Sequence, residues 1–127
     1  MKTPAIDALT RRLASQVVYQ IFPVRFAIGG GRSSADKLAD PAYDLSGAVK
    51  RDWDDTTLNQ SWGQQFFGGD LDGITAKLDY LAELGVTGVY LTPIFPAPSN
   101  HKYDATDFFS VDAMFGGEAA LQRLIQA

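Results

Sequence analysis

The most informative absence in this 127-residue sequence is cysteine, of which there is none. A disulfide framework, a thiolate metal site and a cysteine nucleophile are therefore excluded. Long apolar runs are also missing, because no stretch approaches the length of about 20 residues that a membrane-spanning helix needs. The first residues lack the apolar core of a signal peptide. The sequence as it stands therefore predicts a cytoplasmic protein with no membrane partner.

Basic residues are in the minority, with 11 Lys and Arg against 15 Asp and Glu and a net charge of −4. Such a chain has no positive excess with which to neutralise phosphate groups, so we expect no nucleic acid partner. The phosphate-binding pattern GxxxxGK[ST] and the nucleophile pattern GxSxG are absent as well. A length of 127 residues allows one domain at most, and a hydrophobic content of 46% is enough for a packed core.

A glycine pair followed by an amphipathic stretch marks the centre of the sequence. Apolar side chains recur at steps of three and four over residues 71–84, which predicts one helix over this range. Asp70 is placed to cap the start of this helix and Gly85 to end it. Residues 86–91 are apolar in both alternating sets. This pattern is typical of a parallel strand that is covered on both faces.

A second strand is expected before this centre. Residues 17–22 are rich in β-branched and aromatic side chains and are stopped by Pro23, which predicts a strand. Two strands joined through a helix form a parallel crossover. Helices are also expected at both ends of the chain, with apolar faces made of Ile6, Leu9 and Leu13 before the first strand and of Leu121, Leu124 and Ile125 after Gly116 and Gly117.

The intervening residues 23–66 show no sustained period and predict a long loop. Its middle holds Asp52, Trp53, Asp54 and Asp55, for which two interpretations stay open. The carboxylates are either metal ligands or parts of a solvated turn anchored by the tryptophan. We favour the turn, because calcium requires about six or more oxygen ligands and the spacing matches no known calcium loop.

The side chains best suited to chemistry follow the strand at residues 86–91. His101 is the one histidine of the chain and stands beside Tyr103 and Asp104. In α/β barrels, active sites are built at this carboxyl end of the strands. Each residue also has a purely structural interpretation: an internal hydrogen bond for His101, loop packing for Tyr103 and a turn cap for Asp104. Asp107 is expected to pin the loop.

Four blocks follow one another along the chain: residues 19–23 (YQIFP), 66–74 (FFGGDLDGI), 91–95 (LTPIF) and 97–104 (APSNHKYD). In this order they resemble the start of the catalytic barrel in glycoside hydrolase family 13, the α-amylase family. The similarity is greatest to the group of maltodextrin glucosidase, neopullulanase and cyclomaltodextrinase, and it extends over residues 17–127. It implies an α/β chain that forms the first two βα units of an incomplete (β/α)8 TIM barrel, preceded by a lead-in segment at residues 1–16.

The resemblance also implies a sugar pocket whose ligand is an α-linked glucose oligosaccharide. Tyr103 corresponds to the family's tyrosine that stacks on the sugar just before the scissile bond, and Asp104 to a neighbour that closes this subsite. His101 and Asn100 line the same pocket, and Tyr19 lies beneath it at the end of the first strand.

The family's catalytic residues have no counterpart in these 127 residues. Family members are retaining enzymes, in which an Asp after the fourth strand and a Glu after the fifth lie ~5 Å apart. The resemblance therefore implies a fragment of an α-glucan hydrolase for α-1,4 or also α-1,6 glucosidic bonds, without a catalytic residue and inactive alone. The alternative is a catalytically inactive homologue that serves as a carbohydrate-binding or partner subunit.

The sequence departs from the family pattern after the first strand. Val24 replaces an Asp, and residues 28–30 (IGG) stand where many relatives present Asn and Asp to bind a structural calcium with the Gly-Gly-Asp turn. The loss of two oxygen ligands argues against calcium here. We therefore expect no metal site and no cofactor.

Overall fold

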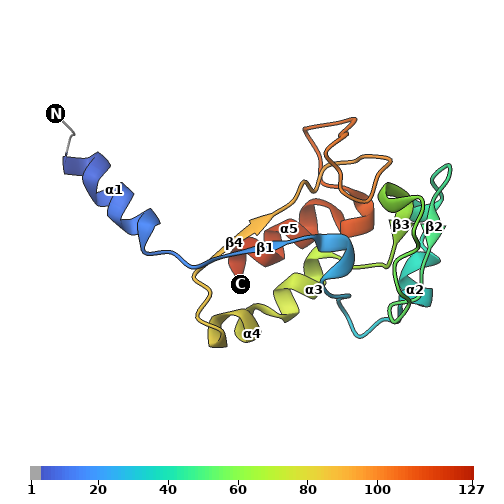
Figure 1. Ribbon diagram of the computed structural model, residues 1–127, viewed down its shortest axis with the longest axis horizontal. Coiled ribbons are helices and arrows are strands. Elements are labelled where there is room, and N and C mark those ends of the chain that lie inside the picture. Colours follow the sequence, from blue (N-terminus) through green and yellow to red (C-terminus); the bar gives the residue numbers. More distant parts are fainter. Residues whose placement is uncertain (1–3) are drawn as a thin grey trace.

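The computed structural model describes residues 4–127 (Figure 1). Residues 1–3 of the predicted lead-in segment and the side chain of Ile6 lie outside the described part. The helices are α1 (Pro4–Ala14), α2 (Ser34–Leu38), α3 (Leu71–Ala76), α4 (Leu78–Glu83) and α5 (Gly117–Gln126). The strands are β1 (Val18–Ile21), β2 (Val49–Lys50), β3 (Gln65–Phe66) and β4 (Gly88–Leu91). Short 3-10 helices lie at Pro23–Arg25, Pro41–Tyr43, Trp62–Gln64 and Ala113–Phe115.

Strands β1 and β4 form the central sheet, and they pair in parallel with Val18 opposite Gly88 and Ile21 opposite Leu91. Helices α3 and α4 connect the two strands, and α5 lies against α3 (Figure 1). The prediction of an α/β chain with two parallel strands joined through a helical layer is confirmed. Asp70 caps α3 as predicted, since its carboxylate accepts from Gly73 N–H at 2.8 Å. Gly85 ends α4 with a φ of +86°.

The single helix predicted over residues 71–84 is wrong, because the chain forms two short helices. The break is at Lys77, whose φ and ψ are −105° and 6°. Just before it, the Thr75 hydroxyl donates to the carbonyl of Leu71 at 3.1 Å. A hydroxyl bound back to the preceding turn bends a helix, which gives a local cause for the interruption.

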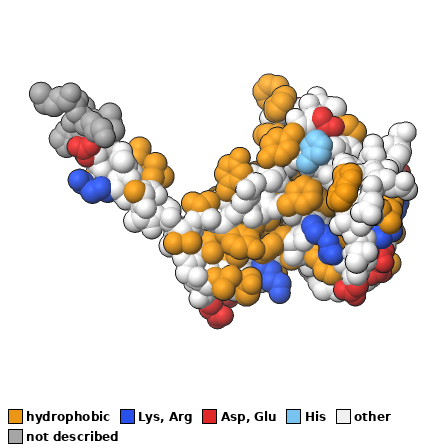
Figure 2. Space-filling model, in the orientation of Figure 1, with side chains coloured by type: hydrophobic (Ala, Val, Ile, Leu, Met, Phe, Trp, Pro, Cys, Tyr) orange, Lys and Arg blue, Asp and Glu red, His pale blue; other side chains and the backbone are white. Residues whose placement is uncertain are grey.

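The prediction that the strand at residues 86–91 is covered on both faces is also wrong for the described chain. Val89 and Tyr90 are 39% and 54% exposed, and in β1 only Ile21 is buried. Within residues 4–127 the central sheet consists of β1 and β4 alone, so no further strand pairs with its outer edges. Figure 2 shows the resulting hydrophobic side chains open in the middle of the molecule. In the described chain β4 therefore has a pairing strand, β1, along one edge only.

The predicted loop over residues 23–66 contains more regular structure than its sequence indicated. It holds α2 and β2, and β2 pairs in parallel with β3 through Val49 and Gln65. Each of these elements has five residues or fewer. Such lengths are too short for a helical or strand period to repeat, which explains why the pattern missed them.

The hydrophobic core lies between the central sheet, the helical layer and the segment around Tyr43. The Tyr43 ring meets Phe66 edge-on with centroids 5.9 Å apart, which ties the small sheet to the rest of the molecule. Helix α5 contributes buried Ala120 together with partly buried Leu121 and Leu124. The prediction of Ile125 for this apolar face is wrong, since its side chain is 68% exposed. The central members are Ile21, Val24, Leu38, Leu71, Ile74, Leu81, Met114 and Phe115.

The leading helix is confirmed as α1, but its predicted apolar face does not pack on the core. Leu9 and Leu13 are 56% and 63% exposed. The helix points away from the remaining elements (Figure 1). Its two described leucines therefore lie outside the hydrophobic core.

A bidentate ion pair joins α3 to α5. Arg123 donates from Nε and Nη2 to the two carboxylate oxygens of Asp72 at 2.8 and 2.9 Å. These hydrogen bonds hold the pKa of Asp72 below its usual value. A carboxyl whose pKa is lower in the folded state stabilises the fold at higher pH, where it is ionised in both states.

Replacing Arg123 with methionine should therefore destabilise the protein at neutral pH and not in strong acid. The difference in free energy of unfolding from the unmodified chain should be constant above about pH 5 and should vanish as the pH falls well below about 4. Urea unfolding across this range measures it. Arg11→Met on exposed α1 is the control, and a difference for Arg123→Met that persists in strong acid would contradict the assignment.

Candidate functional site

The loop at residues 92–111 leaves the carboxyl end of β4 and carries four of the five predicted site residues. It is the orange segment that rises above the sheet in Figure 1. Pro93, Pro96 and Pro98 fix φ in its first part and limit its conformations. In parallel sheets, sites form at this end of the strands, so the loop lies where a ligand is expected.

Ser99 organises the tip of the loop. Its hydroxyl oxygen accepts from the backbone N–H of Lys102 at 3.0 Å, and the hydroxyl donates to Oδ1 of Asp104. Lys102 has a φ of +62°, so the chain turns sharply there. The turn places His101, Tyr103 and Asp104 around one serine.

His101 and Tyr103 form a tilted pair of rings. The backbone N–H of Tyr103 donates to Nδ1 of His101 at 3.1 Å, which leaves the ring proton of a neutral His101 on Nε2. The ring centroids are 5.9 Å apart with an angle of 31° between the planes. Tyr103 is 63% exposed. The pair therefore offers a flat apolar face with hydrogen-bonding groups at its edge.

Asp104 lies beside this pair as an exposed carboxylate. The hydrogen bond from the Ser99 hydroxyl lowers its pKa from the usual value, with a smaller contribution of the same sign from His101. Asp104 is therefore ionised at neutral pH and can accept hydrogen bonds from ligand hydroxyl groups.

Replacing Ser99 with alanine should raise the pKa of Asp104 toward the ordinary aspartate value of about 3.9, because the hydroxyl donor is lost. An NMR titration of the side-chain carboxyl carbons measures this shift. Ser110→Ala is the matched control, because Ser110 donates in the same way to Asp107 at 2.5 Å and lowers its pKa. That variant should raise the pKa of Asp107 and leave Asp104 unchanged. An unchanged pKa of Asp104 in Ser99→Ala would refute the role of Ser99.

Asn100, which was predicted to line the pocket, is instead buried and faces the protein. Its side-chain amide donates to the carbonyls of Trp62 and Gln65 at 2.7 and 3.0 Å, and its backbone N–H donates to Gly63 at 2.7 Å. Asn100 therefore fastens the loop to residues 62–65. The sequence did not predict Trp62, which is 63% exposed and is held beside this loop; an isolated tryptophan among polar residues was the available signal.

The structure does not bring Tyr19 to this loop, so its predicted place beneath the pocket is wrong. Tyr19 is the second residue of β1, and its ring lies edge-on to Phe26 with centroids 6.2 Å apart. Together with Lys77 and Tyr80 these residues line a separate hollow of about 230 Å³. In a strand, alternate side chains point to opposite faces, and Tyr19 shares the face of buried Ile21. Tyr19 therefore points toward the helical layer.

Lys102 supports the loop from inside the protein, a role that no pattern in the sequence indicated. Its side chain is fully buried, and Nζ bonds the carbonyl of Ala97 at 2.9 Å and Asp112 at 2.7 Å. The rings of Phe66 and Phe115 lie 5.5 and 5.6 Å from Nζ. Burial lowers the pKa of Lys102, and the bond to Asp112 opposes this shift. The first and last parts of the loop are thereby tied together. Because lysines are rarely buried, the residue type alone predicted a surface position for Lys102.

Two further sequence predictions are confirmed outside this cluster. Asp107 pins the loop, since its carboxylate accepts from Phe109 N–H at 2.8 Å. In the acidic turn, Asp52 accepts from Asp54 N–H at 3.2 Å, and Asp55 accepts from Asp52 N–H at 3.1 Å.

Within residues 4–127 no group of three or more histidine or acidic side chains is arranged to hold a metal ion. No helix in that range has the length and hydropathy needed to cross a membrane.

Comparison with known proteins gives consistent similarities. Residues 20–127 match the family description "Alpha amylase, catalytic domain". A cyclomaltodextrinase from Geobacillus thermopakistaniensis (strain MAS1) is 50% identical over 110 residues, covering 87% of this chain and 16% of the relative. The intracellular maltogenic amylase of Bacillus subtilis (strain 168) is 50% identical over 113 residues, with the same two coverages. The chain thus spans about a sixth of the length of these curated relatives.

A similar solved structure is a cyclic α-maltosyl-(1→6)-maltose hydrolase from Arthrobacter globiformis in complex with maltose. It aligns with a TM-score of 0.68 and 42% identity, over 91% of this chain and 23% of that one.

Proposed function

The chain belongs to glycoside hydrolase family 13, the α-amylase family, and on that premise we propose that it forms the first two βα units of a (β/α)8 TIM barrel in an α-glucan hydrolase. Residues 17–127 make up this part of the barrel, and residues 1–16 lead into it. The parallel pair of β1 and β4, with α3 and α4 between them, supports the proposal. The exposed apolar side chains on both strands support it too, because further strands and helices cover such side chains in a complete barrel.

The proposed substrate is an α-linked glucose oligosaccharide of the maltodextrin type. The observation that carries this is the ring pair of exposed Tyr103 and half-buried His101, in the loop that follows the carboxyl end of β4. A sugar ring presents an apolar face that stacks on tyrosine, and its hydroxyl groups bond to the tyrosine hydroxyl, to Nε2–H of His101 and to Asp104. Asn100 acts behind them by holding the loop in place. The maltose in complex with the Arthrobacter hydrolase is a ligand of this class.

We assign binding and orientation of the sugar to this chain and no step of bond breaking. Retaining hydrolysis of α-1,4 or α-1,6 glucosidic bonds needs a carboxylate nucleophile and an acid ~5 Å apart. The resemblance places these two groups after the fourth and fifth barrel strands, and residues 4–127 supply two strands of the central sheet. The 127 residues alone should therefore show no turnover. We further propose a cytoplasmic place of action, which the relative named intracellular maltogenic amylase supports.

An NMR titration of the chain with maltotriose tests the binding role. We expect chemical-shift changes at His101, Tyr103 and Asp104, no release of glucose, and roughly tenfold weaker binding after Tyr103→Ala through lost stacking. Tyr80→Ala is the matched control, because Tyr80 is also exposed, at 53%, and lies on α4.

Two results would contradict the assignment. Equal weakening by the two tyrosine variants would show that Tyr103 has no special place in the pocket. Release of glucose by the 127-residue chain would show that bond breaking lies within it. Continuation of the reading frame without the family's Asp and Glu strands would instead identify a binding or partner subunit.

A further inference from the structure

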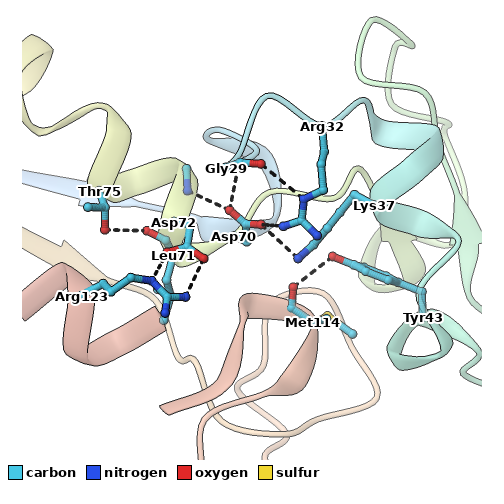
Figure 3. A network of polar contacts seen from close by, with 11 residues as sticks. Gly29, Arg32, Lys37, Tyr43, Asp70, Leu71, Asp72, Thr75, Met114 and Arg123 are labelled. Atoms are coloured by element: carbon cyan, nitrogen blue, oxygen red, sulfur yellow. Dashed lines mark hydrogen bonds and ion pairs between the residues drawn. The ribbon is translucent and has the colours of Figure 1, made fainter. Parts of the chain in front are cut away.

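The carboxylate of Asp70 is buried and fully occupied by donors from the protein (Figure 3). Its Oδ1 accepts from the backbone N–H groups of Gly29 and Gly73 at 2.9 and 2.8 Å. Its Oδ2 faces Nη2 of Arg32 at 3.1 Å and Nζ of Lys37 at 3.0 Å. A carboxylate has about four acceptor positions, and all four are used here.

This arrangement does not fit a calcium ion at the Gly-Gly-Asp turn. Calcium takes about six to eight oxygen ligands. Residues 28–30 have no oxygen in their side chains, and both oxygens of nearby Asp72 are bound to Arg123. The ammonium group of Lys37 lies 3.0 Å from the Asp70 oxygen that a metal ion would need. A second cation at that oxygen would meet both a filled acceptor and a like charge.

We propose that Lys37 is a fixed cation that takes the place of a structural metal ion. Assisted by Arg32, it neutralises Asp70 and ties residues 28–38 to the start of α3, so the fold does not depend on divalent cations. This proposal is independent of the sugar-binding role of the loop at residues 92–111.

The position of Lys37 is fixed by the surrounding residues. Ser33 caps α2 by accepting from Asp36 N–H at 3.1 Å, and this sets Lys37 in the helix. The Lys37 side chain is 4% exposed and its stem packs beneath Gly68, where an added Cβ would lie 3.0 Å from Cγ. Lysine stems pack in this way against apolar surroundings while the charged end meets its partner.

Lys37 is the more important of the two cations. The side chain of Arg32 is 44% exposed, so water and salt screen its attraction to Asp70. Buried Tyr43 lies close by without competing, because its hydroxyl donates to the carbonyl of Met114 at 3.2 Å. Burial raises the pKa of Tyr43, so the hydroxyl stays neutral and keeps its proton.

The unmodified chain provides the first test. We expect the same thermal unfolding midpoint in excess calcium chloride and in excess EDTA, and no saturable binding heat when calcium chloride alone is titrated in. A higher midpoint in calcium than in EDTA, or saturable binding, would overturn the proposal. This comparison of calcium with EDTA requires no variant, so it tests the proposal even if a substitution prevents folding.

The second test compares variants of the two cations. Lys37→Met should lower the unfolding midpoint by about 10 °C or more, because a buried carboxylate loses its main partner. Arg32→Met is the matched control and should lower it by much less. Combining Lys37→Met with Asp70→Asn should recover most of the loss, since the unpaired charge is removed. Equal losses for the two single variants, or no recovery in the combination, would show that Lys37 is not the cation that Asp70 requires.

Discussion

Replacing Gly73 with alanine should destabilise the protein by about 3 kcal/mol or more, although alanine is the better helix former. Gly73 lies inside α3, and an added Cβ would stand 2.0 Å from the carbonyl oxygen of Ala27 and 2.3 Å from its carbonyl carbon. Helix propensity favours alanine by only about 1 kcal/mol. The clash is with backbone, which cannot rotate away as a side chain can, so the close approach outweighs the propensity.

Urea unfolding followed by circular dichroism measures this loss. Gly88→Ala is the matched control, because its added Cβ would lie 3.6 Å from Cγ2 of Val18, an ordinary contact. We expect that variant to change the free energy of unfolding by less than about 1 kcal/mol. A Gly73→Ala protein that unfolds at the same urea concentration as the unmodified chain would show that residues 27 and 73 do not approach as described.

The close approach at Gly73 illustrates what the sequence could and could not predict. Side-chain periods predicted the parallel strands, and the residue types at the helix ends predicted the cap at Asp70 and the stop at Gly85. These features depend on neighbours within a few residues. The contact between Gly73 and Ala27 joins segments 46 residues apart in the numbering. Nothing in the local pattern distinguishes this glycine from a weak helix position.

In the candidate site, too, the sequence predicted some features and missed others. Residue type and position after a strand singled out His101, Tyr103 and Asp104, and the structure gathers them around Ser99. The sequence did not predict in which direction each side chain points. Asn100 turns inward to bind the backbone at residues 62–65, and Tyr19 turns toward α4 because strand alternation places it on the side of Ile21.

Nothing in the sequence indicated that two of the lysines are buried. Lys37 and Lys102 are 3% and 0% exposed when the whole residue is counted, yet lysine is among the residues least often buried. Lys37 is paired with Asp70, 33 residues away, and Lys102 with Asp112, 10 residues away. A single sequence shows neither pairing, because no local pattern links such partners. Charge composition describes the balance of the whole chain and says nothing about where individual charges lie.

Of these two lysines, Lys102 is the one that supports the proposed sugar-binding loop. Replacing it with methionine should lower the free energy of unfolding by about 3–5 kcal/mol. Methionine fills similar space among Phe66 and Phe115 but leaves the carboxylate of Asp112 and the carbonyl of Ala97 without their ammonium partner. An unpaired charge in that position is the main source of the loss. If the loop binds sugar as proposed, the same change should weaken that binding, since Lys102 joins the first and last parts of the loop that carries Tyr103.

A second substitution separates lost charge pairing from lost packing. Asp112→Asn removes the stranded charge and keeps an Oδ1 that can accept from Met114 N–H, as Asp112 does at 3.0 Å. Combined with Lys102→Met it should regain most of the lost free energy of unfolding, whereas exposed Lys77→Met should change little. If the combined variant were no more stable than Lys102→Met alone, packing around the lysine stem would contribute more than the ion pair. Recovery of stability with sugar binding still weakened would show that the ion pair itself holds the loop in its binding conformation.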